Sequence, residues 1–253
     1  MSENYTIRED FTLPSLGKVY DKPVNPNVSL RSMTTEEEMR RLAHSERPYK
    51  VLCGIIDDCM VGEKPGISTY DMCLGDYQYL LHRLRVVTYG SDYTIDTYCP
   101  FCDTINKQKM NLDDLKVNTY TDEIEQYFNI TLPKTGKILK LRVQTPRSVD
   151  DITIKKKDFI KKNPEVESDP GLLLTLKSLV ETVDGELLDP VKLDRILRKL
   201  PMADTNYILK CAEKLTSMIG VSTEFDCTCK ECGGEYRSSF RITPEFFGPT
   251  LDE

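Results

Sequence analysis

The sequence predicts an α+β protein, and three observations lead to that class. Apolar residues recur at helical spacing through residues 34–85 and again through 146–220. Residues 86–98 and the last 30 or so residues instead favour β structure, with alternating apolar and polar side chains. Each of these two β regions also carries a Cys-x-x-Cys pair. We therefore expect a helical region, a β region and an inserted helical block, followed by the second half of the β region.

Length and composition set limits on this protein. Its 253 residues suffice for one large or two small domains, with 30% charged and 39% hydrophobic residues. No apolar run approaches the ~20 residues that a membrane-crossing helix needs. The first residues, Met1-Ser2-Glu3-Asn4, are polar and do not resemble a secretory signal. We expect a protein that works in a reducing cytoplasm without a membrane partner.

The net charge of −7 disfavours nucleic acid as a partner, because such proteins usually carry a basic face. One basic stretch runs over residues 155–157 and 161–162. It is interleaved with Asp158 and followed by Glu165, which is typical of a solvated helix face.

The N-terminal residues 1–33 are predicted to be an extended arm. Leu13-Pro14-Ser15-Leu16-Gly17 indicates a turn, and Val28-Ser29-Leu30-Arg31 a short strand. Because residues 1–30 contain few core-like apolar positions, we expect them to be loose alone and to order against a neighbouring subunit.

The helical region, residues 34–85, begins with a capping-box pattern, Thr34-Thr35-Glu36-Glu37-Glu38. This first helix should stop near Pro48. Two further helical faces follow at residues 51–60 and 73–84.

Residues 86–145 are predicted to hold the first half of the β region. Val86, Val87 and Tyr89 precede Gly90-Ser91-Asp92, and an alternating stretch follows, so a β-hairpin is expected over residues 86–98. A further strand is expected over residues 138–143.

The inserted helical block is predicted to span residues 146–220. It has apolar stripes at 172–183, 193–200 and 208–219. Each stripe indicates core packing or a helix–helix contact, with a partner-binding face as the alternative. Residues 221–253 then form the second half of the β region and a C-terminal tail.

Nine cysteines are many for a cytoplasmic chain, and an odd number cannot all pair. Four of them stand alone in helical patterns, where they are expected to be small buried hydrophobic residues: Cys53, Cys59, Cys73 and Cys211.

The two Cys-x-x-Cys pairs predict a structural zinc site made by Cys99, Cys102, Cys229 and Cys232. Zinc prefers four tetrahedral ligands in structural sites, and each pair places two thiolates on one side of the metal. Gly233-Gly234 follows the second pair, where a tight turn needs a residue that tolerates positive φ. The expected fold is a β-hairpin zinc ribbon assembled from two distant knuckles.

Two features weaken this interpretation and leave alternatives open. The pairs are separated by 126 residues, far more than in a contiguous ribbon, so unrelated buried cysteines or a redox motif are alternatives. The redox alternative is disfavoured, because a redox motif would open a helix and neither pair is followed by a helical pattern. Cys227 could also replace Cys229 or Cys232 as a ligand, although the glycine pair that follows Cys232 favours Cys232.

A catalytic role has no support in the sequence. Four thiolates close the zinc shell, whereas catalytic zinc keeps a position open for water. The only two histidines, His44 and His82, lie in predicted helices away from the knuckles. No phosphate-binding loop, dinucleotide fingerprint or HExxH motif is present.

Motifs at both ends of the chain, in their order, resemble a known family. The first is Phe11-x-Leu13-Pro14-Ser15-x-Gly17-x-x-Tyr20, followed by Val28-x-Leu30-Arg31-x-Met33-Thr34-Thr35-Glu36-Glu37. The two cysteine pairs come next, and Pro244-Glu245-Phe246-Phe247-Gly248-Pro249 comes last. Together they resemble the baseplate hub or hub-assembly proteins of contractile-tailed bacteriophages, with a loose match over residues 118–220.

This resemblance implies a non-enzymatic subunit that builds the phage tail baseplate. The expected partners are other tail proteins in a hetero-oligomer, with no small-molecule substrate. The expected location is the virion, with the host cytoplasm during assembly. Two other classes remain open: a zinc-ribbon nucleic-acid-binding or transcription module, and a thiol-exchange enzyme. The first would use basic residues near the knuckles: Lys107, Lys109, Lys230 and Arg237.

Overall fold

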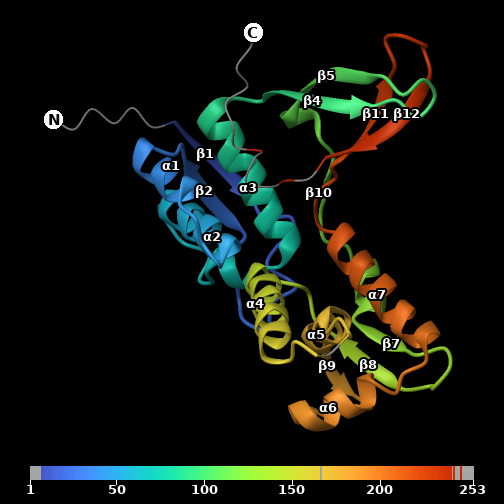
Figure 1. Cartoon of the computed structure of the whole chain (residues 1–253). Coiled ribbons are helices and arrows are strands. Elements are labelled where there is room, and N and C mark those ends of the chain that lie inside the picture. Colours follow the sequence, from blue (N-terminus) through green and yellow to red (C-terminus); the bar gives the residue numbers. More distant parts are fainter. Residues whose placement is uncertain (1–6, 166, 241, 243–245, 247–253) are drawn as a thin grey trace.

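The computed structural model describes residues 7–165, 167–240, 242 and 246. It confirms the α+β class, with helices beside small antiparallel sheets. Three parts are distinguishable in Figure 1: an N-terminal lobe (residues 7–89), an insert (residues 119–219) and a pair of β-hairpins. Each part has its own cluster of buried apolar side chains.

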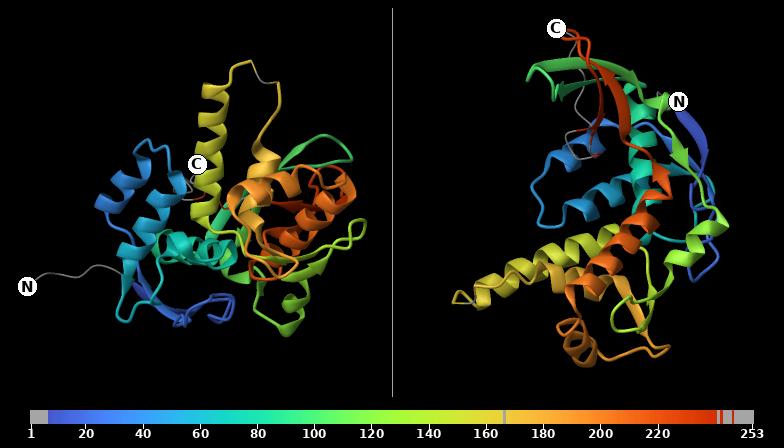
Figure 2. Two further views of the ribbon diagram at one scale, coloured as in Figure 1. Left: turned by 90° about the horizontal axis from the view of Figure 1, so that it is seen from below. Right: turned by 90° about the vertical axis from the view of Figure 1, so that its right-hand side faces the viewer.

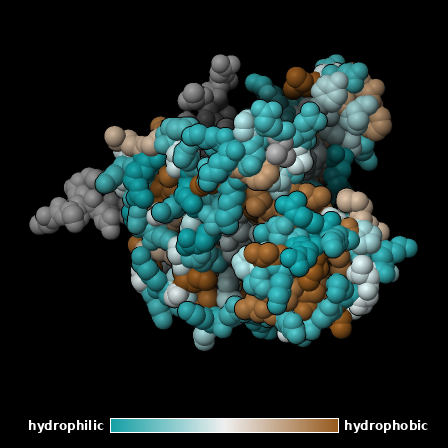
Figure 3. All heavy atoms as spheres, turned by 60° about the horizontal axis from the view of Figure 1, so that its bottom comes forward, coloured by the Kyte–Doolittle hydropathy of each residue, from teal (hydrophilic) through white to brown (hydrophobic). Residues whose placement is uncertain are grey.

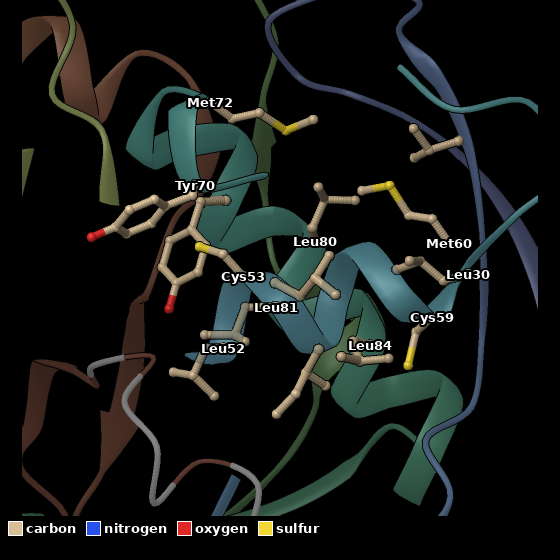
Figure 4. Packing of buried hydrophobic residues seen from close by; sticks show 14 of the residues in the cluster. Leu30, Leu52, Cys53, Cys59, Met60, Tyr70, Met72, Leu80, Leu81 and Leu84 are labelled. Carbon is tan, nitrogen blue, oxygen red and sulfur yellow. The ribbon is translucent and has the colours of Figure 1, made fainter. Parts of the chain in front are cut away.

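The N-terminal lobe packs helices against a three-stranded antiparallel sheet of order β1-β2-β3. The elements are β1 (Arg8–Thr12), β2 (Asn27–Arg31), α1 (Thr35–Leu42), α2 (Pro48–Cys59), β3 (Met60–Val61), η1 (Thr69–Asp71) and α3 (Leu74–Tyr89). Figure 4 shows side chains from β2, α2 and α3 converging in its core, among them Leu30, Leu52 and Leu81.

The helix starts in this lobe follow their sequence signals. The Thr34 N–H donates to the Glu37 carboxylate at 2.8 Å, as the capping box predicts, and Pro48 occupies the first turn of α2. Arg31 also donates to Glu37 at 2.6 Å, which joins β2 to α1.

The loose arm predicted for the N-terminal segment is wrong for residues 8–31. Leu13 and Leu30 are fully buried in the first core. Polar bonds anchor the connecting loop: the Ser15 N–H and the Tyr20 hydroxyl donate to the buried Asp76 carboxylate at 2.9 and 2.6 Å. The buried leucines and these hydrogen bonds hold the segment in place, although it contains few apolar residues. Residues 1–6 lie outside the described residues.

The hairpin predicted over residues 86–98 is also wrong in its first half. Val86 and Val87 lie in α3, which runs to Tyr89. Gly90, at φ 86°, ends the helix, and its N–H donates to the Val86 carbonyl at 2.8 Å. The buried Arg85 guanidinium donates to the Gly90 carbonyl at 2.6 Å, which further fixes this helix end.

A short antiparallel strand pair forms the neck where the insert leaves and rejoins the rest of the chain. In this neck β6 (Val117–Asn118) pairs with β10 (Gly220–Val221). The Ser222 N–H extends the pairing with a bond to the Lys116 carbonyl at 2.8 Å.

The insert itself combines helices with a small antiparallel sheet, β7-β8-β9. Its elements are η3 (Asp122–Tyr127), β7 (Asn129–Thr131), β8 (Ile138–Leu141), α4 (Pro146–Lys162), α5 (Gly171–Leu179), β9 (Val180–Val183), α6 (Pro190–Leu197) and α7 (Met202–Ser217). The strand expected over residues 138–143 is present as β8. The stripe at 172–183 is not one helix, because its last four residues form β9 and pair with β8.

The insert is joined to the N-terminal lobe by a buried carboxylate. Asp150 of α4 accepts from the Lys50 N–H, in the first turn of α2, and from the Tyr70 hydroxyl, each at 3.0 Å. An anion at a helix N-terminus is favoured by the helix dipole.

Two hairpins complete the fold and lie together at the end of the molecule opposite α6 (Figures 1 and 2). The first joins β4 (Asp92–Tyr98) to β5 (Ile105–Asn111), and the second joins β11 (Glu224–Thr228) to β12 (Glu235–Ser239). The short helix η2 (Leu112–Asp114) follows β5. A third core, which includes Val86, Leu112, Phe240 and Phe246, connects the hairpins to α3.

The surface view in Figure 3 is mostly hydrophilic, with hydrophobic residues set among the polar ones. Among the described residues, the helices are all too short or too polar to cross a membrane.

Candidate metal centre

The structure brings together the sulfur atoms of Cys99, Cys102, Cys229 and Cys232. All four lie within 4.8 Å of one another. The Cys99 and Cys232 sulfurs are 3.8 Å apart, and those of Cys102 and Cys229 are 3.5 Å apart. Both of these contacts cross from one hairpin to the other, so the cluster joins segments that are 126 residues apart in the chain.

Each cysteine pair lies in the turn of its hairpin, and the two turns have the same backbone bonds. In the first, the Asp103 N–H donates to the Cys99 carbonyl and the Cys99 N–H donates to the Thr104 carbonyl. In the second, the Gly233 N–H donates to the Cys229 carbonyl and the Cys229 N–H donates to the Gly234 carbonyl. Gly233 has φ 71°, as predicted, and Asp103 adopts the same left-handed backbone at φ 59°.

This equivalence extends into the strands as an approximate two-fold relation, in which each residue of the first hairpin matches the residue 130 positions later. Alternation of buried and exposed residues is the same from 96 to 105 as from 226 to 235. The cross-strand pair Thr97–Asn106 matches the pair Cys227–Tyr236. Cys227 is therefore the counterpart of Thr97, buried in the layer beneath the sulfurs and outside the four-sulfur cluster.

The inner faces of the two hairpins are joined by polar bonds. Thr97 and Tyr236 share a hydrogen bond of 2.7 Å between their hydroxyl groups, and the Gln108 amide donates to the Thr228 carbonyl at 3.2 Å. These bonds fix the hairpins against each other close to the sulfurs.

Asn106 is the side chain that contacts the cluster most directly. Its amide donates to the Cys229 sulfur at 3.4 Å and to the Thr104 carbonyl at 3.2 Å. Its carbonyl oxygen accepts from the Lys230 N–H at 3.0 Å. Asn106 is buried, so this one side chain orients both knuckles. Sequence reasoning missed it, because a single Asn in an alternating strand gives no signal.

Gly234, the second glycine of the pair, allows the two knuckles to approach each other closely. A β-carbon at Gly234 would lie 2.6 Å from the Phe101 ring. Only glycine lets this aromatic ring lie directly on the second knuckle.

Neighbouring hydrogen-bond donors favour the thiolate form of one cysteine, Cys229. Backbone N–H groups of Cys232 and Glu231, together with the Asn106 amide, lower the pKa of Cys229 to about 6. The Gly234 N–H favours the Cys232 thiolate, but the neighbouring sulfurs, Cys102 first, raise the pKa of Cys232 to about 12. Four sulfurs this close cannot all carry charge without a cation between them.

The arrangement fits a tetrahedral metal with four thiolates. Zinc–sulfur bonds of about 2.3 Å place the sulfurs of a tetrahedron about 3.8 Å apart, close to the distances found here. Two of the cysteines, Cys99 and Cys229, are buried and two are exposed, so the cluster lies at the edge of the hairpins. A shell of four protein ligands leaves no position for a reacting water.

The other cysteines and the histidines lie away from this cluster. Cys53, Cys59, Cys73 and Cys211 are buried in the apolar cores, as expected. His82 is buried in α3, and His44 is exposed after α1. Within the described part of the chain, no second cluster of His, Cys, Asp and Glu with metal-ligand spacing occurs.

Comparisons with known proteins agree with the sequence resemblance. A family model described as T4 bacteriophage base plate protein matches residues 5–248, almost the whole chain. No curated protein and no solved structure matches. The matched region includes the N-terminal lobe, the insert, both hairpins and all four clustered cysteines. The chain therefore belongs to the T4 bacteriophage base plate protein family, and its role is a structural one in a phage baseplate.

Proposed function

We propose that this protein is a zinc-clamped structural or assembly subunit of the hub region of a bacteriophage tail baseplate. It binds other tail proteins within a hetero-oligomer and catalyses no reaction. The observation that carries the proposal is the four-sulfur cluster between two distant hairpins, in a chain of a baseplate family.

Zinc in this role is a clamp between two parts of the fold. It would be held by Cys99, Cys102, Cys229 and Cys232, with Asn106 orienting the Cys229 sulfur. When bound, it neutralises part of the thiolate charge and so joins the hairpins. A rigid connection of this kind suits a subunit that must keep its shape while other proteins assemble around it.

The proposed location is the tail baseplate of the virion, reached by assembly in the host cytoplasm. A reducing cytoplasm keeps the nine cysteines as thiols, which is the form that zinc requires.

The nucleic-acid alternative is weakened by the charges around the hairpins. Arg237 pairs with Asp226 at 3.2 Å, and Lys107 lies directly opposite Asp96 in the β4–β5 pairing. Two of the four basic side chains named for such a surface therefore lie beside acids, which weakens the case for a basic face at the hairpins. Thiol exchange would need free cysteines, which bound zinc removes.

Metal content and phage complementation test the proposal together. Pure wild-type protein should contain one zinc per chain, and the double variant Cys99→Ser/Cys229→Ser should contain none and melt at a lower temperature. The wild-type gene should restore baseplate assembly to a phage that lacks it, and the variant should not. Freshly reduced protein without metal, or a phage that assembles baseplates equally well without the gene, would contradict the proposal.

A further inference from the structure

Three large apolar side chains are exposed at the first knuckle. Tyr98 is 59% exposed, Phe101 66% and Ile105 67%. Tyr98 and Ile105 lie opposite each other at the end of the β4–β5 pairing, and Phe101 is in the turn that joins these strands. They form one patch at the tip of the hairpin, here called the apolar tip. Figure 1 shows that the β4–β5 hairpin ends at the outer edge of the molecule.

The second knuckle shows that the turn itself does not need apolar residues at these places. The approximate two-fold relation matches the apolar tip with Thr228, Glu231 and Glu235, and all three are exposed. Both turns nevertheless have the same backbone bonds and supply two sulfurs each. Apolar residues at these places are therefore not required for the turn or for supplying the sulfurs. Apart from the contact of the Phe101 ring with Gly234, most of their apolar surface is exposed to water, which carries a cost.

The charges around the tip are mainly acidic. The two turns, residues 99–104 and 229–235, contain Asp103, Glu231 and Glu235 against Lys230 alone. Four thiolates around one zinc ion add a further net charge of about −2. A partner surface that is complementary to this border must carry lysine or arginine around an apolar centre.

We propose that the apolar tip docks into an apolar socket, bordered by basic side chains, on a different protein of the tail. A second copy of this chain is disfavoured as the occupant, because two acidic tips would repel each other. The area also disfavours it. Burying the exposed parts of three such side chains removes roughly 300–500 Å² from water. A self-pairing tip would fall short of the ~1,200 Å² total of a stable dimer.

A small rigid contact of this kind fits one of several made by a subunit in a multi-protein assembly. This inference rests on the proposed baseplate role, and it adds the surface and the chemistry of the partner. Its two tests distinguish failure of the inference from failure of that role.

Photo-crosslinking identifies what contacts the tip. The photoreactive residue p-benzoylphenylalanine is placed at Tyr98 in one full-length variant and at the matched Thr228 in another. Both are expressed in cells infected with the phage. We expect the Tyr98 probe to capture one other tail protein, at a segment with apolar and basic residues, and the Thr228 probe not to capture it. Equal capture from both positions, or capture mainly of a second copy of this chain, would overturn the inference.

A residue exchange between the knuckles tests whether the tip is needed. The variant Tyr98→Thr/Phe101→Glu/Ile105→Glu places the polar residues of the second knuckle on the first. Its zinc content should equal that of the wild type, because the four cysteines and the backbone bonds of both turns stay in place and the Phe101 ring supplies no ligand. Baseplate assembly in complementation should fall about a hundredfold or more, since loss of a single buried aromatic anchor weakens binding tenfold or more.

The control removes three exposed apolar residues far from the tip, in the variant Ile160→Glu/Leu187→Thr/Val191→Glu. It should complement as the wild type does. If the exchange variant holds zinc and assembles baseplates as well as the wild type, the inference fails while the baseplate role stands. Equal losses in both triple variants would also overturn it. Failure of the wild type itself would instead count against the baseplate role.

Discussion

At the scale of single residues, Asn106 holds three groups of the two knuckles at once. We predict that Asn106→Ala weakens zinc binding about 10- to 100-fold, as loss of a side chain that orients a metal ligand typically does. The physical reason is the loss of the bonds to the Cys229 sulfur and the Lys230 N–H, at 3.4 and 3.0 Å. Competition with a chromophoric chelator measures the affinity.

Tyr236 is the matched control for Asn106, because it occupies the equivalent position on the second hairpin. Its hydroxyl bonds to Thr97 and interacts with the sulfur of Cys227, which lies outside the four-sulfur cluster. Tyr236→Phe should therefore lower thermal stability slightly and leave zinc affinity close to that of the wild type. Equal losses of affinity in both variants would mean that general loosening of the hairpins, and not the bond to sulfur, is responsible.

Gly234 and Phe101 provide a second prediction, on the contact between the knuckles. Gly234→Ala should destabilise the protein by about 1–2 kcal/mol, because the new β-carbon would lie 2.6 Å from the Phe101 ring. In a Phe101→Ala background the same substitution should cost almost nothing. Urea unfolding of the four proteins gives the coupling energy. A cost that is unchanged without the ring would show that the backbone, and not the ring, requires glycine.

The knuckles also show which residues a sequence can and cannot reveal. Gly233 was predictable, since a glycine after the last cysteine of a turn indicates positive φ. Asp103 was not, although it has the same backbone, because aspartate is common in many other conformations. The burial of Cys227 becomes understandable only once its counterpart Thr97 is seen in the paired hairpin.

At the scale of elements, α3 carries a buried histidine that should make the protein acid-sensitive. Burial lowers the pKa of His82 from 6.5 to about 4, with the Arg83 charge acting in the same direction. One ring nitrogen lies 3.0 Å from the Leu112 carbonyl, and the other has no partner among the described residues. The folded state thus holds His82 neutral where the unfolded chain would bind a proton.

The sign of the pH effect follows from this lowered pKa. As pH falls from 6.5 to 4, the unfolded state gains a proton first, so stability is lost over that window, roughly 3 kcal/mol in all. Above pH 6.5 the full contribution is present. Urea unfolding at several pH values should show a flatter profile between pH 6.5 and 4 for His82→Gln. Parallel profiles for variant and wild type would contradict this assignment.

The start of α3 lies against the neck of the insert, where Gly75 of α3 closely approaches Gly220 of β10. A β-carbon at Gly75 would lie 2.4 Å from the Ile219 carbonyl oxygen, which is backbone and cannot move aside easily. We predict that Gly75→Ala destabilises the protein by more than about 2 kcal/mol, whereas Gly54→Ala in α2 stabilises it by about 0.5–1 kcal/mol. Among the described residues, the one atom within 4 Å of a β-carbon at Gly54 belongs to the flexible Arg40 side chain, at 3.4 Å. Urea unfolding of both variants checks this, and a mild effect at Gly75 would show that this close approach is adaptable.

Element prediction failed where β-branched residues sat at the end of a helix. Val86 and Val87 favour a strand by propensity, yet α3 continues through them because both side chains are buried against neighbouring parts of the fold. Val180 and Val183 failed in the opposite sense. They continue a helical stripe in the sequence, but their pairing with β8 makes them a strand. In both cases tertiary contacts overrode local preference.

At the scale of the whole molecule, the α+β class and the grouping of the four cysteines were predictable, because periodicity and cysteine spacing are local signals. The packing of residues 8–31 was not. It depends on Asp76, which lies more than 50 residues away and accepts bonds from Ser15 and Tyr20. The sequence around a buried carboxylate in a helix does not indicate which distant residues donate hydrogen bonds to it.

The neck changes how much zinc contributes to the fold. From the sequence alone, zinc would close a loop of 126 residues. In the structure β6 and β10 already hold the ends of the insert together. Zinc then closes a loop that consists only of residues 103–116 and 222–228, which are 21 residues in total. The entropic cost of closing the shorter loop is lower by roughly 1.5 kcal/mol.

This argument predicts that weakening the neck weakens zinc binding at a distance. Ser222→Pro removes the N–H that donates to the Lys116 carbonyl at 2.8 Å, whereas Ser222→Ala keeps it. We expect the proline variant to bind zinc up to about tenfold more weakly, the equivalent of the roughly 1.5 kcal/mol lost when the loop is no longer closed in advance. The alanine variant should bind as the wild type does. Chelator competition measures both, with circular dichroism to verify that the helices of the insert persist. Equal zinc affinities in the two variants, with the neck opened in one, would mean that the hairpins come together without help from the neck.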